Sequence, residues 1–168
     1  MPTRFSPRTK SLLRTVHCLS ACGWTGGGLA VLILLNLAGA PAGQGEAEAF
    51  QRSITAIDDE LIIPSAGVAA LSGLLLCRFK PWGCGERRWV VGKCLITFLL
   101  LAFGAFWLRP GMQSLVPGVF DADLAAAYHR HWLRGSTAAV LQTMGLLLLV
   151  GLSIVKPTGE RRRAAGRR

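Results

Sequence analysis

Four long apolar runs constrain the fold of this chain more than any other feature of its sequence. They cover residues 15–39, 61–79, 89–108 and 136–155. A helix needs about 20 apolar residues to cross the hydrocarbon core of a bilayer, and each run has about that length. The sequence therefore predicts an all-α fold: one polytopic transmembrane domain of four membrane-spanning helices.

The charged residues are distributed unevenly between the two sides of the predicted spans. Residues 1–14, 78–88 and 156–168 together hold fourteen Lys and Arg and two acids, whereas residues 41–60 and 109–134 hold four Arg and seven acids. The positive-inside rule then places both termini and the loop at 80–88 in the cytoplasm, and it places outer loops near residues 41–60 and 109–134. Because the basic residues flank apolar runs, the net charge of +10 indicates orientation in a lipid bilayer and no nucleic-acid partner.

The two ends of the chain each carry a further prediction. The basic residues 1–14, the apolar run and the AGAPA segment at 38–42 resemble a secretory signal, but a signal core has about 7–15 residues. The longer run favours an uncleaved first helix. The basic tail, residues 157–168, is predicted to be disordered.

Residues 109–134 are too polar to span a membrane. Asp121 or Asp123 can cap a helix there, and Leu124, Tyr128, His131 and Trp132 give that helix a weakly amphipathic face. The pattern predicts a short interfacial helix before the fourth span.

Polar groups occur at two other places near the spans. Asp58, Asp59 and Glu60 precede the second span, where they act either as a solvated helix cap or as a proton or cation site. Pro64 is expected in the first turn of that span. Gln142, inside the fourth span, is expected to form an interhelical hydrogen bond.

Ionisable residues inside a membrane are rare, and they suggest a functional site. His17 lies about one turn inside the first span and Lys93 about one turn inside the third, at similar depth. An imidazole can ligate haem iron, and an ammonium group can pair with a propionate. If His17 and Lys93 face a common cavity, Trp24 and Trp89 would give that cavity flat walls that suit a porphyrin or a quinone. Alternatively, Lys93 extends to the interface and His17 bonds a backbone carbonyl.

Several short stretches resemble a family of uncharacterised bacterial integral membrane proteins with four helices. They are HCLSACGWTGGG (17–28), AIDDELIIPSA (56–66), LSGLLLC (71–77), RRWVVGK (87–93), FWLRPG (106–111) and SIVKP (153–157). More distantly, the early His followed by a Trp-Gly element is similar to HemJ-type protoporphyrinogen oxidases and to CopD-like membrane domains. Trp89 and Lys93 match the Trp-x-x-x-Lys of the HemJ-type proteins. This resemblance implies that the protein lies in the bacterial cytoplasmic (inner) membrane. It also implies that two residues hold haem b: His17, as the ligand of the metal, and Lys93.

Two classes of function remain open at this stage. One is a membrane protein that binds haem, porphyrin or quinone through His17 and Lys93. The other is a non-catalytic membrane subunit or small transporter without a cofactor, with other membrane subunits or copies of itself as partners.

Overall fold

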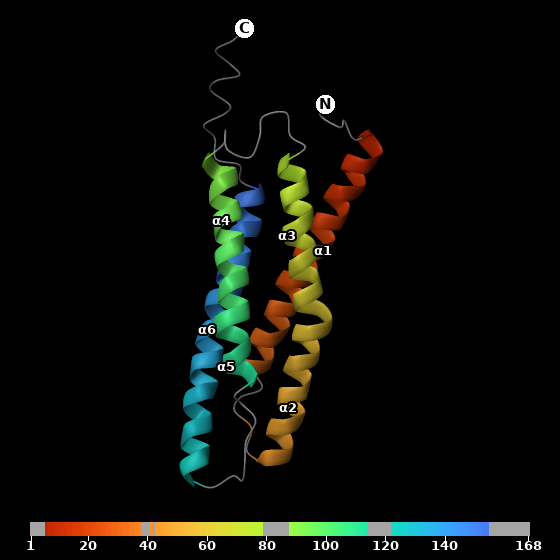
Figure 1. Cartoon of the computed structure of the whole chain (residues 1–168). Helices are drawn as coiled ribbons and strands as arrows, with labels where there is room; N and C mark the ends of the chain where they lie inside the picture. Colours follow the sequence, from red (N-terminus) through yellow and green to blue (C-terminus); the bar gives the residue numbers. More distant parts are fainter. Residues whose placement is uncertain (1–5, 38–40, 42, 79–87, 114–121, 155–168) are drawn as a thin grey trace.

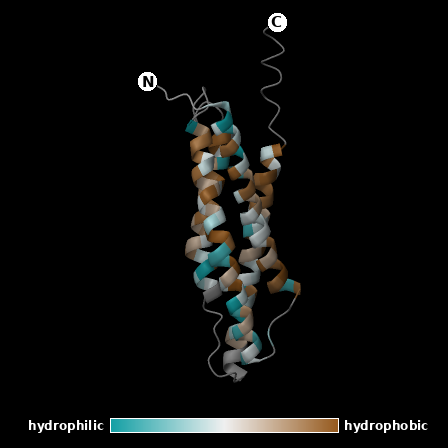
Figure 2. Cartoon of the chain, turned by 90° about the vertical axis from the view of Figure 1, so that its right-hand side faces the viewer, coloured by the Kyte–Doolittle hydropathy of each residue, from teal (hydrophilic) through white to brown (hydrophobic). Residues whose placement is uncertain are grey.

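The computed structural model of the protein describes residues 6–37, 41, 43–78, 88–113 and 122–154. Within these ranges all regular structure is helical, and four helical runs are long and apolar enough to cross a membrane (Figure 1). Hydrophobic residues predominate along the bundle (Figure 2). The prediction of an all-α protein with four transmembrane helices is therefore confirmed. The predicted tail at 157–168 and most of the predicted cytoplasmic loop at 80–88 lie outside the described residues.

Each of the four runs is a helix or a series of helices without a break. The first is α1 (Pro7–Leu37), and the fourth is α6 (Ala122–Ile154). The second consists of α2 (Gln44–Ile57), the π-helical turn η1 (Asp58–Ile62) and α3 (Ile63–Arg78). The third consists of α4 (Arg88–Phe103), the π-helical turn η2 (Gly104–Leu108) and α5 (Arg109–Gln113).

Helix α1 begins about two turns before the predicted apolar run. Ser6 caps it, because its hydroxyl accepts a hydrogen bond from the backbone N–H of Thr9 at 3.2 Å. Pro7 occupies the first helical position, where a missing N–H costs nothing. The cap and the proline together extend the helix into the basic N-terminal segment.

The predicted loop at 41–60 is wrong for most of its length, because residues 44–57 form α2. The polar composition of this segment conceals a helical spacing of apolar residues. Ala47 and Ile54 are buried against α1 and α6, and Phe50 packs on the same cluster.

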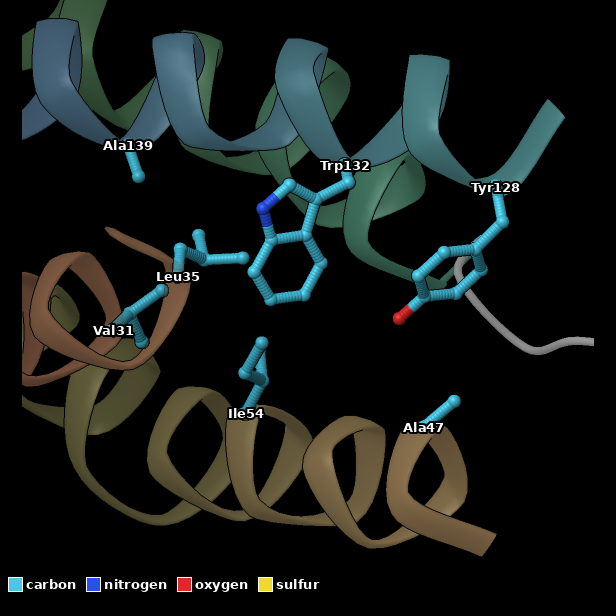
Figure 3. Close-up of a cluster of buried hydrophobic side chains, with 7 residues drawn as sticks. All are labelled: Val31, Leu35, Ala47, Ile54, Tyr128, Trp132 and Ala139. Atoms are coloured by element: carbon cyan, nitrogen blue, oxygen red, sulfur yellow. The ribbon is translucent and has the colours of Figure 1, made fainter. Parts of the chain in front are cut away.

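The predicted interfacial helix does not form a separate element, because its residues are the first part of α6. Tyr128 and Trp132 are buried instead of lying in a membrane surface. The Trp132 ring lies 4.9 Å from that of Phe50 in α2, centroid to centroid. Figure 3 shows the Trp132 ring directed toward Leu35 of α1 and Ile54 of α2, and the Tyr128 ring directed toward Ala47 of α2. The amphipathic face therefore binds protein rather than lipid.

The four runs form a bundle in which α1 packs against α3 and α6, and α4 packs mainly against α6. Helices α1 and α4 lie diagonally opposite each other. We call the end that carries Arg8, Lys10, Arg14 and Arg78 the basic end. At the opposite end, α2 and the first half of α6 extend beyond α1 and α5 (Figure 1).

The contact between α1 and the second run is unusually close. A Cβ at Gly23 would lie 2.6 Å from Ser65 Oγ, and one at Gly27 would lie 2.6 Å from Ile62 Cγ1. Small residues at such positions allow helix backbones in a membrane to approach each other. The glycine-rich face of the first span is thus used for helix packing.

Candidate functional site

A cavity of about 430 Å³ lies between the four runs. Ligand pockets in proteins have volumes of about 300–1,000 Å³ and mostly apolar walls, so the size and lining are those of a small-molecule site. Every run contributes to the wall. The lining includes Trp24, Gly28, Gln51, Thr55, Asp58, Ala66, Gly67, Leu100, Leu101, Gly104, Ala105, Arg109, Gln142, Thr143 and Leu146.

The polar groups of the cavity are confined to its middle and to the end away from the basic end. Gln51, Thr55, Asp58 and Arg109 lie toward that far end, and Gln142 and Thr143 lie midway. Toward the basic end the wall is apolar, and it consists of Trp24, Ala66, Leu100, Leu101 and Leu146. The cavity is therefore amphipathic along its length.

An ion-pair cluster joins the second and third runs at the polar end. Arg109 Nη1 lies 3.1 Å from Asp58 Oδ2, and Arg109 Nη2 lies 2.8 Å from Asp59 Oδ1. Both carboxylates therefore share one guanidinium. The expected helix cap at Asp58–Glu60 is wrong, because these residues lie inside a continuous helical run. Their neighbour in space is a cation from another helix.

Prolines explain the π-helical turns that position this cluster. Pro64 and Pro110 each follow the last residue of a π turn by two positions. A proline inside a helix has no N–H and its ring collides with the carbonyl four residues earlier, and widening the turn relieves the collision. Pro64 thus lies deep in a helical run and not in a first turn. Asp58 begins one π turn, and Arg109 directly follows the other.

Gln142 crosses from α6 to the third run in the middle of the cavity. Its side chain is 6 % exposed, and Nε2 donates a hydrogen bond to Leu100 O at 3.2 Å. This contact confirms the interhelical hydrogen bond that was expected of Gln142. A Cβ at Gly104 would lie 3.5 Å from the same nitrogen, so η2 passes close to the amide. Next to it, Thr143 donates to Gly28 O at 3.4 Å.

His17 packs between α1 and α3 in the half of the bundle nearer the basic end. Nδ1 lies 3.0 Å from Ala69 O and 3.1 Å from Ser72 Oγ. Ser72 donates its own proton to Val68 O, so Nδ1–H is the donor to both oxygens. The ring edge fills the space beside Gly73, where a Cβ would lie 3.1 Å from Cε1.

Lys93 contacts a different helix from His17. Its Nζ donates a hydrogen bond to Ser153 Oγ of α6. Trp89 lies in the first turn of α4, and its side chain is outside the described part of the chain. Of the three predicted cofactor-binding residues whose side chains the structure describes, Trp24 lines the central cavity, and His17 and Lys93 do not. The structure therefore does not bring His17 and Lys93 into this cavity, and their cofactor role stays a prediction.

Sequence reasoning missed the polar end of the cavity. Gln51 and Thr55 fell in a predicted loop, and Arg109 was not singled out. The one available signal was the opposite charge of Arg109 and the Asp58–Glu60 cluster, on segments predicted to lie on the same side of the membrane. A pairing between them follows from charge, but their common cavity does not.

Comparison with known proteins gives one match. A family model described as "Predicted integral membrane protein (DUF2269)" matches residues 11–157. No curated protein and no solved structure matches the chain. The match supports the resemblance to uncharacterised membrane proteins, whereas the similarity to HemJ-type oxidases and CopD-like domains stays a prediction.

Proposed function

We propose that this chain, which belongs to the DUF2269 family of predicted integral membrane proteins, binds an amphiphilic small molecule of the quinone class in its central cavity. The observation that carries the proposal is the cavity of about 430 Å³ between all four runs, with an apolar wall toward the basic end and polar groups at the other end. A membrane-soluble ring with a polar head matches this distribution.

The residues at the apolar end suit a flat ring. Trp24 is 5 % exposed and offers an aromatic face, and aromatic rings stack favourably on such faces. Small residues on three helices create the space, and these are Gly28, Ala66, Gly67, Gly104 and Ala105. The head of the ligand then lies near Thr55, Asp58 and Arg109. Under the positive-inside orientation, this end faces away from the cytoplasm of a bacterial inner membrane.

The binding test uses tetramethyl-1,4-benzoquinone with purified protein in detergent, followed by calorimetry. We expect saturable binding in the wild-type chain, and we expect Gly67→Phe to abolish it. Gly67 lines the cavity, and a Cβ there meets no atom within 4 Å, so the substitution adds a large side chain at the cavity wall without displacing a neighbour at its root.

The matched control is Gly92→Phe. Gly92 is also a helical glycine with open space at its Cβ position, but it does not line the cavity. This variant should bind the quinone like the wild-type chain. If neither the wild type nor the control binds the quinone, the proposal is overturned.

Haem b at His17 is the second candidate, and a specific contact favours it. Metal-ligating histidines commonly donate one ring N–H to a backbone carbonyl, which orients the other nitrogen toward the metal. His17 makes this bond through Nδ1 to Ala69 O at 3.0 Å, which makes Nε2 the nitrogen for an iron. Bound haem would supply an electron-transfer centre near the basic end, apart from the central cavity, with Lys93 as the partner of a propionate.

An absorption spectrum tests this second candidate. We expect a Soret band in the purified protein, and we expect its loss in His17→Ala while Lys93→Ala weakens it. A protein that is colourless after haem supplementation contradicts it. If the protein also binds no quinone, the alternative of a non-catalytic membrane subunit or small transporter is favoured.

A further inference from the structure

Gln142 is the most buried polar amide in the wall of the central cavity. Only 6 % of the residue is exposed, and it projects from α6 between Gly104 and Leu100 of the third run. Most buried side-chain polar atoms have at least one hydrogen-bond partner. The hydrogen bonds that this amide makes and lacks therefore indicate whether a ligand in the cavity should donate or accept a hydrogen bond.

The amide of Gln142 is paired on one side only. Nε2 donates to Leu100 O at 3.2 Å, and this bond fixes which way the amide faces. Oε1 is buried and accepts no hydrogen bond from the described residues. The hydroxyl of the neighbouring residue Thr143 donates to Gly28 O instead. The unused hydrogen-bonding capacity of Gln142, a residue of the cavity wall, is thus an acceptor.

A second amide in the same wall has the same imbalance. Gln51 donates through Nε2 to Thr55 Oγ1 at 3.3 Å, and its Oε1 is buried without a partner among the described residues. In the same wall, the guanidinium of Arg109 already donates to Asp58 and Asp59. The polar lining therefore contains acceptors that have no partner among the described residues, whereas several of its donors are already hydrogen-bonded.

We propose that Gln142 determines ligand specificity in this cavity, and that it selects molecules which carry a hydroxyl donor on the ring, the hydroquinone over the quinone. This inference rests on the proposed function and names the form of the ligand. A ring hydroxyl donates to Gln142 Oε1, whereas a quinone presents only carbonyl acceptors to an oxygen that is itself an acceptor. No electron transfer is part of the inference.

Three compounds of nearly equal shape test it: tetramethylhydroquinone, tetramethyl-1,4-benzoquinone and the dimethyl ether of the hydroquinone, measured anaerobically by calorimetry. We expect the wild-type chain to bind the hydroquinone about tenfold more tightly than the other two, as one hydrogen bond to a buried acceptor implies. Gln142→Leu should reduce the affinity for the hydroquinone to that for the quinone and leave the quinone nearly unchanged. Met144→Leu, on the exposed side of the same helix, should change nothing.

The outcomes separate this inference from the proposed function. If the wild type binds all three compounds equally, the inference is overturned and the cavity remains a quinone site. If Gln142→Leu weakens all three equally, the residue is structural and the inference is also overturned. If none of the three binds, the proposed function itself fails. If Gln142→Leu does not fold, the ranking of the three compounds in the wild type still decides.

Discussion

Arg109 of the third run donates to Asp58 of the second run, with 3.1 Å between Nη1 and Oδ2. The two residues are 51 positions apart in the chain, and they meet at the polar end of the cavity. The same guanidinium also reaches Asp59, so a single cation joins two helices and neutralises adjacent carboxylates. Three of the four predictions below concern such contacts between runs.

We expect Arg109→Ala to destabilise the protein by about 1 kcal/mol, because it leaves Asp58 and Asp59 side by side without their cation. The destabilisation should be smaller in a background that also carries Asp58→Asn. Thermal unfolding of the four forms in detergent gives the interaction energy. Arg52→Ala, at an exposed arginine of α2, is the control, and additive effects of the two substitutions would contradict the prediction.

Glycines of α1 allow a matched test of the close helix contact. Gly27→Ala should destabilise the protein by about 1–3 kcal/mol, because the new Cβ would lie 2.6 Å from Ile62 Cγ1. Gly26→Ala, one residue earlier, has nothing within 4 Å and should be neutral or slightly stabilising, since alanine favours the helix. Thermal unfolding measures both, and equal effects would refute the contact.

The histidine between α1 and α3 gives a second coupling experiment. Gly73→Ala should be destabilising, because its Cβ would lie 3.1 Å from His17 Cε1. In a His17→Ala background this contact is absent, so Gly73→Ala should become neutral. Unfolding midpoints of the single and double variants test the coupling. A cost of Gly73→Ala that persists without the imidazole would show that another contact is responsible.

Orientation in the membrane is tested by cysteine labelling in intact cells, in a variant whose five native cysteines are replaced by alanine. Ala49→Cys, exposed on α2, should react with a membrane-impermeant maleimide. Ser11→Cys, exposed on α1, should react only after the cells are opened. The reverse pattern would overturn the positive-inside assignment.

The membrane class and the four spans could be predicted from the sequence because apolar length is a local property. Where the helices end was harder to predict. Residues 44–57 look polar, yet Ala47, Phe50 and Ile54 recur at helical spacing, and that pattern could have identified α2. Tyr128 and Trp132 were assigned to a membrane surface because the sequence gives no sign of the partner that buries them.

The central cavity could not be predicted in the same way. It depends on the order in which the helices surround the bundle axis. The same order gives the predicted pair different hydrogen-bond partners, since His17 bonds to α3 and Lys93 bonds to α6. Trp24 was expected in a cavity shared with His17 and Lys93, whereas it lines the central cavity, of which neither of those residues is part. Gln142 was assigned only to helix pairing, and the lack of a partner for its Oε1 among the described residues depends on packing that the sequence does not encode locally.

Each π turn is equivalent to one residue inserted into an α-helix. If the residues of η1 were α-helical instead, that extra residue would rotate α2 relative to α3 by about 100°, since an α-helix has 3.6 residues per turn. Such a rotation would carry Gln51 and Thr55 away from the cavity. The same change in η2 would act in the same way on Arg109. The wider geometry of each π turn is therefore as strictly constrained as the cavity residues themselves, because it fixes the rotation of one half of the run against the other.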